Sequence, residues 1–257
     1  MIKKLVSPFV KILVKELDKR QRKHLANKLG INFNDRFTKE FLNTIQTFSC
    51  FSSKVNALID IGTHKGVFAQ GVSESLSLKK AFCFEPNSEF HEEIKKRLAT
   101  TELNLYSYAL GEFNGEADFF LHKDSTMSSI VESNKEVLKR DFPYDSPEGI
   151  ISLKVKVNTL DRVMESHLNS NNSFFLKIDT QGNELNILKE GKKTLSQTGL
   201  VLIEHMFIDA YKTNYSFKEL INFMSDEGFE CKGALSISRR KSGLISAVDF
   251  LFVKIHE

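Results

Sequence analysis

The residues most suited to chemistry lie in two short segments that follow apolar runs. In the first, residues 58–66, Asp60, Gly62 and Gly66 lie where a strand would turn into a helix. Gly62 permits a tight turn and a close approach of the backbone to a ligand. Gly66 lets the following helix pack closely, and the Asp60 carboxylate suits a cationic amino-acid group. Because ligands of parallel sheets bind beyond the carboxyl ends of the strands, this turn is a candidate binding site.

The second segment, residues 81–87, contains Glu85, which lies 25 residues after Asp60. A carboxylate that ends a second strand can accept hydrogen bonds from both hydroxyls of a ribose. Each segment alone is a weak signal, since tight strand-to-helix turns often need glycine. Together, in this order, they predict a cofactor site formed by Asp60, Gly62, Thr63, Gly66, Glu85 and Pro86.

Two classes of protein, an oxidoreductase and a non-enzymatic binding module, remain alternative interpretations of the sequence. A nicotinamide-dependent oxidoreductase would share the parallel sheet and the acidic ribose ligand. Its G-x-G-x-x-G pattern is missing, however, because Thr63, His64 and Lys65 follow Gly62 where a second glycine is required. A non-enzymatic binding module would instead use the basic N-terminal segment as its working surface.

Short apolar runs alternate with amphipathic segments from residue 55 onward, which indicates an α/β fold with a parallel, doubly wound sheet. The pattern predicts strands over 55–61, 81–85, 103–109, 174–179, 200–204 and 249–255. It predicts helices over 67–76, 88–99, 184–195 and 217–224. The Gly- and Pro-containing residues 110–172 depart from this pattern. We interpret them as an inserted hairpin and loop region over the cofactor edge, with strands over 117–121 and 153–157.

Residues 1–50 are expected to form an N-terminal helical extension to a main domain over 51–257. Residues 1–30 hold nine Lys and Arg against two acidic residues, whereas the whole chain has a net charge of only +3. This segment predicts a basic amphipathic helix that packs on the main domain or a second subunit. Peripheral membrane contact or binding of an anionic carrier are the alternatives. A second helix is expected over 36–48.

The remaining composition excludes several classes of protein. A hydrophobic content of 41% and a charged content of 27% are typical of a globular chain. Three widely spaced cysteines argue against a disulfide framework or a zinc site and favour a reducing compartment. Uncharged residues near the start span only 5–10, too few for a membrane helix or a secretory signal. We therefore expect a cytoplasmic protein, and the confined positive charge argues against a nucleic-acid partner.

The sequence resembles the FkbM family of S-adenosylmethionine (SAM)-dependent methyltransferases from about residue 56 to residue 254. The resemblance implies a Rossmann-like class I methyltransferase fold, with a mostly parallel seven-stranded sheet and helices on both faces. It also implies methyl transfer to a hydroxyl oxygen of a sugar or natural product. Gln181 departs from many members, which have Glu there. The resemblance rests on residues 60–62 with Gly66, 84–86, 109–111 with Gly115, 128–129, 157–161, 176–184, Glu204 and 249–253.

Candidate catalytic residues for such a reaction are Asp179, Glu204 and His205, which end two neighbouring predicted strands. A hydroxyl is a poor nucleophile at neutral pH, so a base or a metal should assist. His205 is a candidate general base, with a histidine held by backbone hydrogen bonds as the structural alternative. Asp179 could orient the acceptor, act as base, or bind a divalent cation such as magnesium together with Glu204.

Other residues of the same motifs have simpler interpretations. Glu184 is expected to stabilise a helix N-terminus, and Asp161 to have a structural role near the start of another helix. Ser128 and Ser129 could contact the cofactor or acceptor, although a structural role is favoured. The acceptor is expected to be a small molecule or glycan. Nothing in the sequence identifies the methylated atom, so N- or S-methylation stays open, and the oligomeric state is not indicated.

Overall fold

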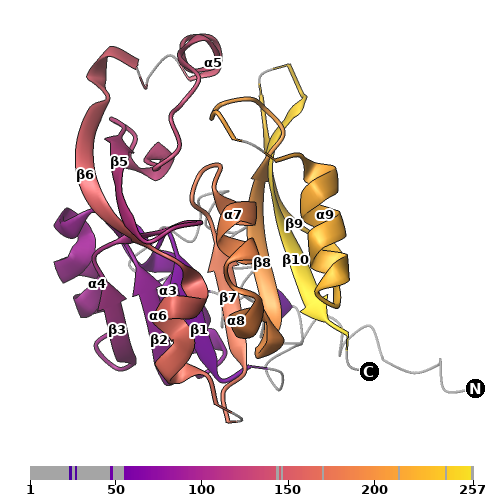
Figure 1. The fold of residues 1–257 in the computed structure, drawn as a ribbon. Coiled ribbons are helices and arrows are strands. Elements are labelled where there is room, and N and C mark those ends of the chain that lie inside the picture. The colour runs from indigo at the N-terminus through magenta and orange to yellow at the C-terminus, as the bar shows by residue number, and fades with distance from the viewer. Residues whose placement is uncertain are drawn as a thin grey trace, which may run out of the picture.

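Seven strands form one sheet in the order β3-β2-β1-β7-β8-β10-β9 (Figure 1). The pairs from β3 through to β8 are parallel, and β10 runs antiparallel to both β8 and β9. The expected Rossmann-like, mostly parallel seven-stranded sheet is thus confirmed. The strands are β1 (Ala57–Ile61), β2 (Lys80–Phe84), β3 (Glu102–Tyr106), β7 (Phe174–Ile178), β8 (Thr198–Met206), β9 (Phe229–Arg239) and β10 (Ile245–Lys254).

This computed structural model describes residues 55–255 apart from 143–144, 146, 170, 214 and 241, together with 23–24, 27 and 47–48. The helices predicted over 1–30 and 36–48 therefore lie almost wholly outside the described residues. None of the helices that the structure does describe combines the length and apolar character needed to cross a membrane.

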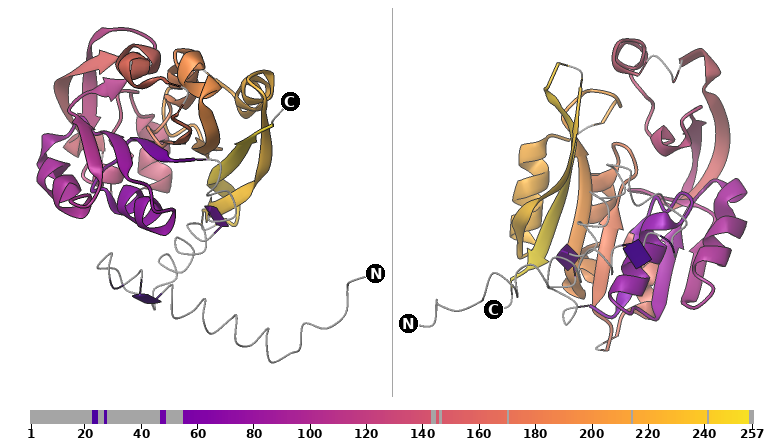
Figure 2. Two further views of the ribbon diagram at one scale, coloured as in Figure 1. Left: turned by 90° about the horizontal axis from the view of Figure 1, so that it is seen from below. Right: turned by 180° about the vertical axis from the view of Figure 1, so that it is seen from behind.

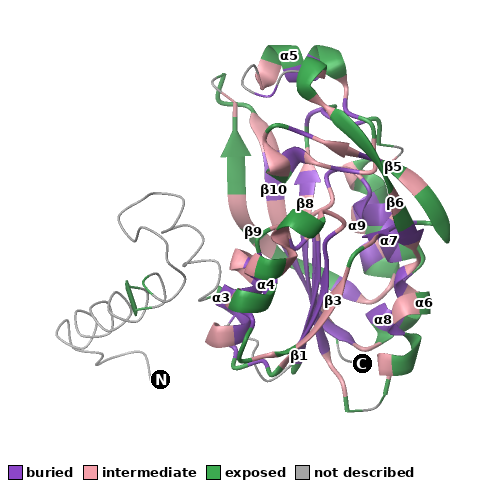
Figure 3. Cartoon of the chain, turned by 90° about the vertical axis from the view of Figure 1, so that its left-hand side faces the viewer, coloured by how far each residue is buried: buried purple, intermediate pink, exposed green. Residues whose placement is uncertain are grey.

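Both faces of the central strands are buried, which explains their continuous apolar sequences. All five residues of β1 and of β7 are buried, in contrast to the exposed residues of β6 and α5 (Figure 3). Residues of β1 alternate between two cores, with Ile59 and Ile61 on one face and Leu58 on the other. This alternation fixes which side chains at the strand ends can reach a common site.

Helices cover the two faces of the sheet, as Figure 2 shows. The helices α3 (Val67–Ser75) and α4 (His91–Arg97) pack on the face that includes Leu58. The opposite face is covered by four helices whose buried residues join Ile59 and Ile61 in one core. These are α6 (Leu160–Met164), α7 (Glu184–Lys189), α8 (Lys192–Ser196) and α9 (Phe217–Asp226).

The region between β3 and β7 forms a second, three-stranded sheet in the order β4-β6-β5. Strand β5 (Gly115–Leu121) pairs antiparallel with β6 (Ile151–Asn158), and β4 (Ala109–Leu110) runs parallel to β6. This agrees with the inserted hairpin expected there. Between β5 and β6 the chain forms η3 (Ser125–Met127), α5 (Lys135–Asp141) and η4 (Pro147–Gly149). Short 3₁₀ turns also occur elsewhere, as η2 (Ser88–Phe90) and η5 (Glu165–His167).

Three elements differ from the sequence-based prediction. The helix predicted over 184–195 is two helices, because the chain turns at Gly191, where the Asp161 carboxylate caps the N-terminus of α8. The strand predicted over 103–109 ends at Tyr106, and residues 109–110 join the second sheet. Strand β9 was not predicted, because most of its residues are exposed and it lacks a continuous apolar run.

Candidate active site

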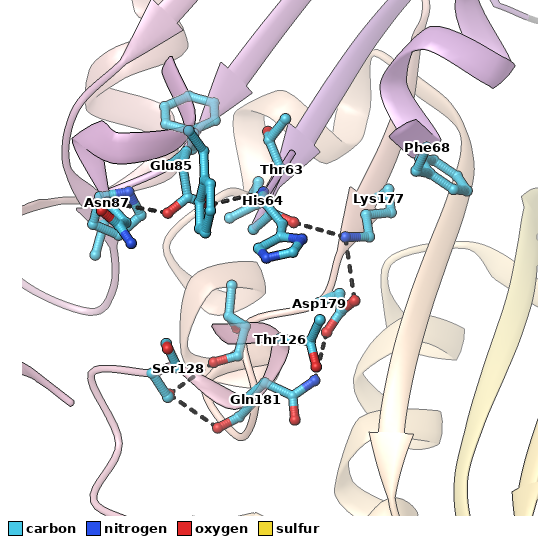
Figure 4. A pocket seen from close by; sticks show the side chains of 18 of the residues that line it. Thr63, His64, Phe68, Glu85, Asn87, Thr126, Ser128, Lys177, Asp179 and Gln181 are labelled. Carbon is cyan, nitrogen blue, oxygen red and sulfur yellow. Dashed lines mark hydrogen bonds and ion pairs between the residues drawn. The ribbon is translucent and has the colours of Figure 1, made fainter. Parts of the chain in front are cut away.

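A cavity of about 460 Å³ opens beyond the carboxyl ends of β1, β2 and β7. The strand order reverses here, since β2 and β3 lie on one side of β1 while β7 and β8 lie on the other. Such a reversal point is where open parallel sheets bind ligands. The side chains that line the cavity come from the turns after these strands and from residues 125–130 of the insertion (Figure 4).

The turn between β1 and α3 brings backbone to the cavity surface. Gly62 has a φ of 79°, and a Cβ added there would lie 1.9 Å from the carbonyl oxygen of Asp179. Only glycine therefore allows β1 and β7 to end this close together. Gly62 and Thr63 line the cavity. Gly66 does not, and its place is at the N-terminus of α3, where an added Cβ would lie 3.4 Å from the Cα of Ile94.

Glu85 projects from the end of β2 into the same cavity, with Pro86 beside it. Its Oε2 accepts a hydrogen bond of 2.7 Å from the backbone N–H of His64, and its Oε1 accepts one of 2.8 Å from that of Asn87. Burial raises the pKa of Glu85 to about 7, although both hydrogen bonds favour the charged form. Each carboxylate oxygen can still accept a further hydrogen bond, as a ribose diol would require.

Asp60 does not line the cavity. Its side chain is fully buried behind the turn, with Oδ1 3.5 Å from the Lys177 ammonium. Burial raises the pKa of Asp60 to about 6, and Lys177 opposes that shift. The predicted cofactor residue Asp60 thus lies behind the cavity lining, on the face of the sheet that Leu58 shares with α3.

Lys177 connects the ends of β1 and β7 (Figure 4). Its Nζ donates a 2.9 Å hydrogen bond to the carbonyl oxygen of Gly62 and lies 3.3 Å from Oδ2 of Asp179. Burial lowers the pKa of this ammonium, but Asp179 and Asp60 outweigh that effect and raise it above its ordinary value. Lys177 therefore keeps its charge and pairs with two carboxylates, that of Asp179 in the cavity lining and that of Asp60 behind it.

A smaller pocket of about 250 Å³ adjoins the cavity and shares Thr126, Asp179 and Gln181 with it. Glu204, at the end of β8, also lines this smaller pocket. The side-chain amide of Gln181 donates to Oδ1 of Asp179 at 2.7 Å and to Oε2 of Glu204 at 2.6 Å. The structure thus brings the two predicted catalytic carboxylates together, with one amide between them.

The carboxylates of Asp179 and Glu204 lie close enough to repel each other. The pKa of Glu204 is raised well above its usual range by burial and by the charges of Asp179, Asp249 and Glu184. Asp249 lies directly opposite Glu204 in the pairing of β8 with β10, and burial raises its pKa to about 6. Carboxylates with raised pKa values are better general bases than ordinary ones near neutral pH.

The loop that carries Gln181 is held in an uncommon conformation. Gln181 has a φ of 59°, in the left-handed region that non-glycine residues seldom adopt. The Ser129 hydroxyl contacts the carbonyl oxygens of Thr180 and Gln181 at 2.8 and 3.0 Å. The Glu184 carboxylate accepts hydrogen bonds from the backbone N–H groups of Thr180 and Gly182. Ser129 and Glu184 thus have structural contacts that fix this loop.

His205 lies on the other face of the sheet from Glu204, because successive strand residues point to opposite sides. The centroid of its ring lies 5.0 Å from that of Phe207 and 5.1 Å from that of Phe217. His205 lines neither pocket. Burial lowers its pKa to about 4. His205 is therefore not brought to the site where a general base was expected.

Lys177 and Asp249 are site residues to which the sequence analysis gave no role. Lys177 lies two positions before Asp179 on one strand, so both side chains point to the same side. Asp249 is an acidic residue within the otherwise apolar residues 248–253. A charged residue inside a buried strand is the signal that could have identified each of them.

Among the described residues, no group of three or more His, Cys, Asp or Glu side chains is arranged to hold a metal ion. Asp179 and Glu204 are two carboxylates, and one oxygen of each already accepts a hydrogen bond from Gln181.

Comparison with known proteins places this site in a family. Residues 60–231, more than half of the chain, match the Methyltransferase FkbM domain. The 2-O-methyltransferase NoeI of Sinorhizobium fredii (strain NBRC 101917 / NGR234) is 22% identical over 174 residues, 65% of this chain and 70% of that protein.

Two solved structures are similar at lower identity. A methyltransferase FkbM from Methylobacillus flagellatus KT has a TM-score of 0.47 and 14% identity, over 94% of this chain and 60% of that one. A ribosomal protein L11 methylase from Lactobacillus delbrueckii subsp. bulgaricus has a TM-score of 0.43 and 10% identity, over 87% and 80% of the two chains. These two similarities add nothing to the domain match, which by its extent is decisive: the chain belongs to the FkbM family of SAM-dependent methyltransferases.

Proposed function

We propose that this methyltransferase transfers the methyl group of SAM to a hydroxyl oxygen of a sugar, glycan or similar polyhydroxylated metabolite. The observation that carries the proposal is the Asp179–Gln181–Glu204 cluster, in a pocket that adjoins the larger cavity. A hydroxyl must lose its proton as it is methylated, and these carboxylates are placed to take it. The resemblance to a protein named 2-O-methyltransferase agrees with an oxygen acceptor.

The larger cavity fits SAM in size and in chemistry. Its volume of about 460 Å³ lies in the range typical of small-ligand sites. Glu85 would accept the ribose hydroxyls, and the backbone at Gly62 and Thr63 would lie against the amino-acid portion. Phe84 and Tyr108 would provide apolar contact for the base. SAM, when bound, supplies a methyl group on a positively charged sulfur.

The residues of the chain have separate tasks in this proposal. Lys177 holds Gly62 and Asp179 in place, and Asp60 helps to keep Lys177 charged. Gln181 orients the two carboxylates by donating to both. Glu204, whose pKa is raised by burial and by its acidic neighbours, is the proposed general base, and Asp179 would orient the acceptor hydroxyl. Methyl transfer needs this hydroxyl in line with the methyl–sulfur bond, so orientation contributes strongly to the rate.

A divalent cation bound by Asp179 and Glu204 is a second way to activate the hydroxyl. Chelation with EDTA separates the two alternatives. A cation mechanism predicts loss of activity that added magnesium restores. A carboxylate base predicts turnover that EDTA leaves unchanged.

The experiment that tests the proposal offers labelled SAM to the purified chain with a panel of sugars, glycolipids and glycans. We expect label in a methyl ether, and we expect the Glu204→Gln variant to lose about 100-fold or more of the turnover. Label found only on an amine or a thiol would contradict the proposal. The Asp118→Asn variant, which removes an exposed carboxylate outside both pockets, is the control.

Cytoplasmic localisation and the role of residues 1–30 stay predictions. A chain lacking residues 1–30 tests the segment directly, by its binding to anionic vesicles and its turnover of SAM. Loss of vesicle binding with retained turnover would support peripheral membrane attachment. Unchanged vesicle binding would contradict it.

A further inference from the structure

The smaller pocket, where the proposed acceptor binds, has a marked imbalance of charge. Three carboxylates line it, those of Asp124, Asp179 and Glu204. No Lys, Arg or His is among the described residues that line it. The pocket therefore offers an incoming ligand three carboxyl groups and no cationic lining side chain that could pair with an anionic group.

Two cations close to this lining are engaged elsewhere. Lys177 binds Asp60, Asp179 and the carbonyl oxygen of Gly62 on the side of the larger cavity. Arg240, two residues beyond Ser238, lies 3.3 Å from the carboxylate of Asp141. Recruiting Lys177 to an anionic ligand would take it from the fully buried Asp60, and leaving a buried charge unpaired is costly.

The rest of the lining suits a polyhydroxylated ring. Met127, Phe142, Met206 and Ala247 give apolar surface for the C–H face of a sugar. The hydroxyls of Thr126, Ser238 and Ser246 can donate to or accept from ring hydroxyls. Convergent polar groups beside apolar side chains are typical of sites that orient such ligands.

Asp124 is the carboxylate that the proposed chemistry does not use. Its Oδ1 accepts hydrogen bonds from the backbone N–H and the hydroxyl of Thr126, at 3.2 and 2.6 Å, and so begins η3. The backbone N–H of Asp124 donates to the buried Asp145. Asp124 is thereby fixed among the lining residues that the insertion contributes.

We infer that the acceptor ring which enters this pocket carries no negative charge, and that Asp124 is a residue that determines this specificity. The inference rests on the proposed function and names its substrate class: neutral or amino-bearing sugars, as opposed to uronic acids and sugar phosphates. A negative group a few ångströms from fixed carboxylates is repelled, and repulsion of the wrong ligand is an effective source of specificity.

The test uses matched acceptors that differ only in charge. Methyl glycosides of glucose, galactose and mannose are compared with the corresponding uronic acids, 6-phosphates and 2-amino sugars, with labelled SAM as donor. We expect kcat/KM for the best neutral or amino glycoside to exceed that for its uronic acid at least tenfold. Equal or faster methylation of the uronic acid or the phosphate would overturn the inference while leaving the proposed function intact.

The variant Asp124→Asn tests the residue itself. Asn keeps the Oδ1 acceptor that begins η3 but removes the charge. We expect the ratio of kcat/KM for neutral over anionic acceptor to fall about fivefold or more, whereas Asp118→Asn, which removes an exposed charge outside the pocket, leaves that ratio unchanged. An unchanged ratio in Asp124→Asn would remove Asp124 from the inference. If no hydroxyl of any acceptor is methylated, the proposed function itself fails, and the inference with it.

Discussion

The two adjoining pockets are built in different ways. Much of the larger cavity is formed by the turns after β1 and β2, within residues 61–68 and 84–90, where the turn at Gly62 brings backbone to the surface. The remainder comes from the insertion, from β7 and the loop after it, and from β8, β9 and β10. The smaller pocket draws its lining from β8, β9, β10, the loop after β7 and the insertion. The larger cavity thus depends more on local turns, whereas the smaller pocket depends wholly on side chains from distant parts of the chain.

This difference has a physical consequence for each pocket. A backbone-built surface depends on turn geometry, so it tolerates few changes at Gly62 but many at neighbouring side chains. A surface built from side chains of several elements depends on how those elements pack, and its charges can be altered one by one. We therefore expect variants of the first pocket to affect cofactor binding and variants of the second to affect transfer.

The largest effect is expected for Gly62→Ala. The added Cβ would lie 1.9 Å from the carbonyl oxygen of Asp179, at a φ of 79° that disfavours alanine. We expect the free energy of unfolding to fall by about 3 kcal/mol and SAM binding to be lost, as measured by urea denaturation and calorimetry. In Gly149→Ala the added Cβ has no heavy atom within 4 Å, so this control should be nearly neutral. Equal stability in the two variants would contradict a backbone-built cavity.

A second prediction concerns the pH dependence of SAM binding. Glu85 has a pKa raised to about 7, so a growing fraction is protonated as the pH falls below 7 and can no longer accept two hydroxyl donors. Affinity for SAM should fall about tenfold between pH 8 and pH 6. Asp60 and Asp249, whose pKa values are raised to about 6, add to this loss of SAM affinity near pH 6. Glu85→Gln should bind SAM more weakly at pH 8 with a flatter profile, and an equally steep profile would count against Glu85.

A third prediction concerns Ser129, which links the insertion to the loop that carries Gln181. Removing its hydroxyl in Ser129→Ala leaves the carbonyl oxygens of Thr180 and Gln181 without this donor. We expect a loss of about 1–2 kcal/mol in stability, and a larger fall in kcat than in SAM affinity. The exposed Ser152→Ala is the matched control. A fall confined to SAM affinity would place this loop with the cofactor cavity instead.

The smallest effect is expected for His205→Phe. The His205 ring packs among Phe207, Tyr215 and Phe217, and its Nδ1 is buried with no hydrogen-bond partner. Phenylalanine should fit this aromatic cluster, leaving kcat within about twofold and stability unchanged or slightly higher. A loss of activity of 100-fold, measured with saturating SAM, would restore His205 as the general base.

The larger cavity could be predicted from the sequence better than the smaller pocket, because its turns are local in the sequence. Turn residues such as Gly62 and strand-end acids such as Glu85 are encoded within a few positions of each other, so the central sheet and the cofactor edge could be predicted. The smaller pocket depends on Phe142 and Ser238, which follow no periodic pattern. The face of the sheet on which His205 lies was not predicted either, because it depends on the register of β8 rather than on residue type.

The most direct test of two pockets with separate tasks compares Glu85→Ala with Glu204→Gln. For each variant, the SAM dissociation constant is measured by calorimetry and the methyl-transfer rate is measured with saturating SAM. We expect Glu85→Ala to weaken SAM binding at least tenfold, and Glu204→Gln to keep SAM affinity within about twofold while losing about 100-fold or more in rate. The account would be contradicted if Glu204→Gln lost SAM affinity to the same extent as Glu85→Ala.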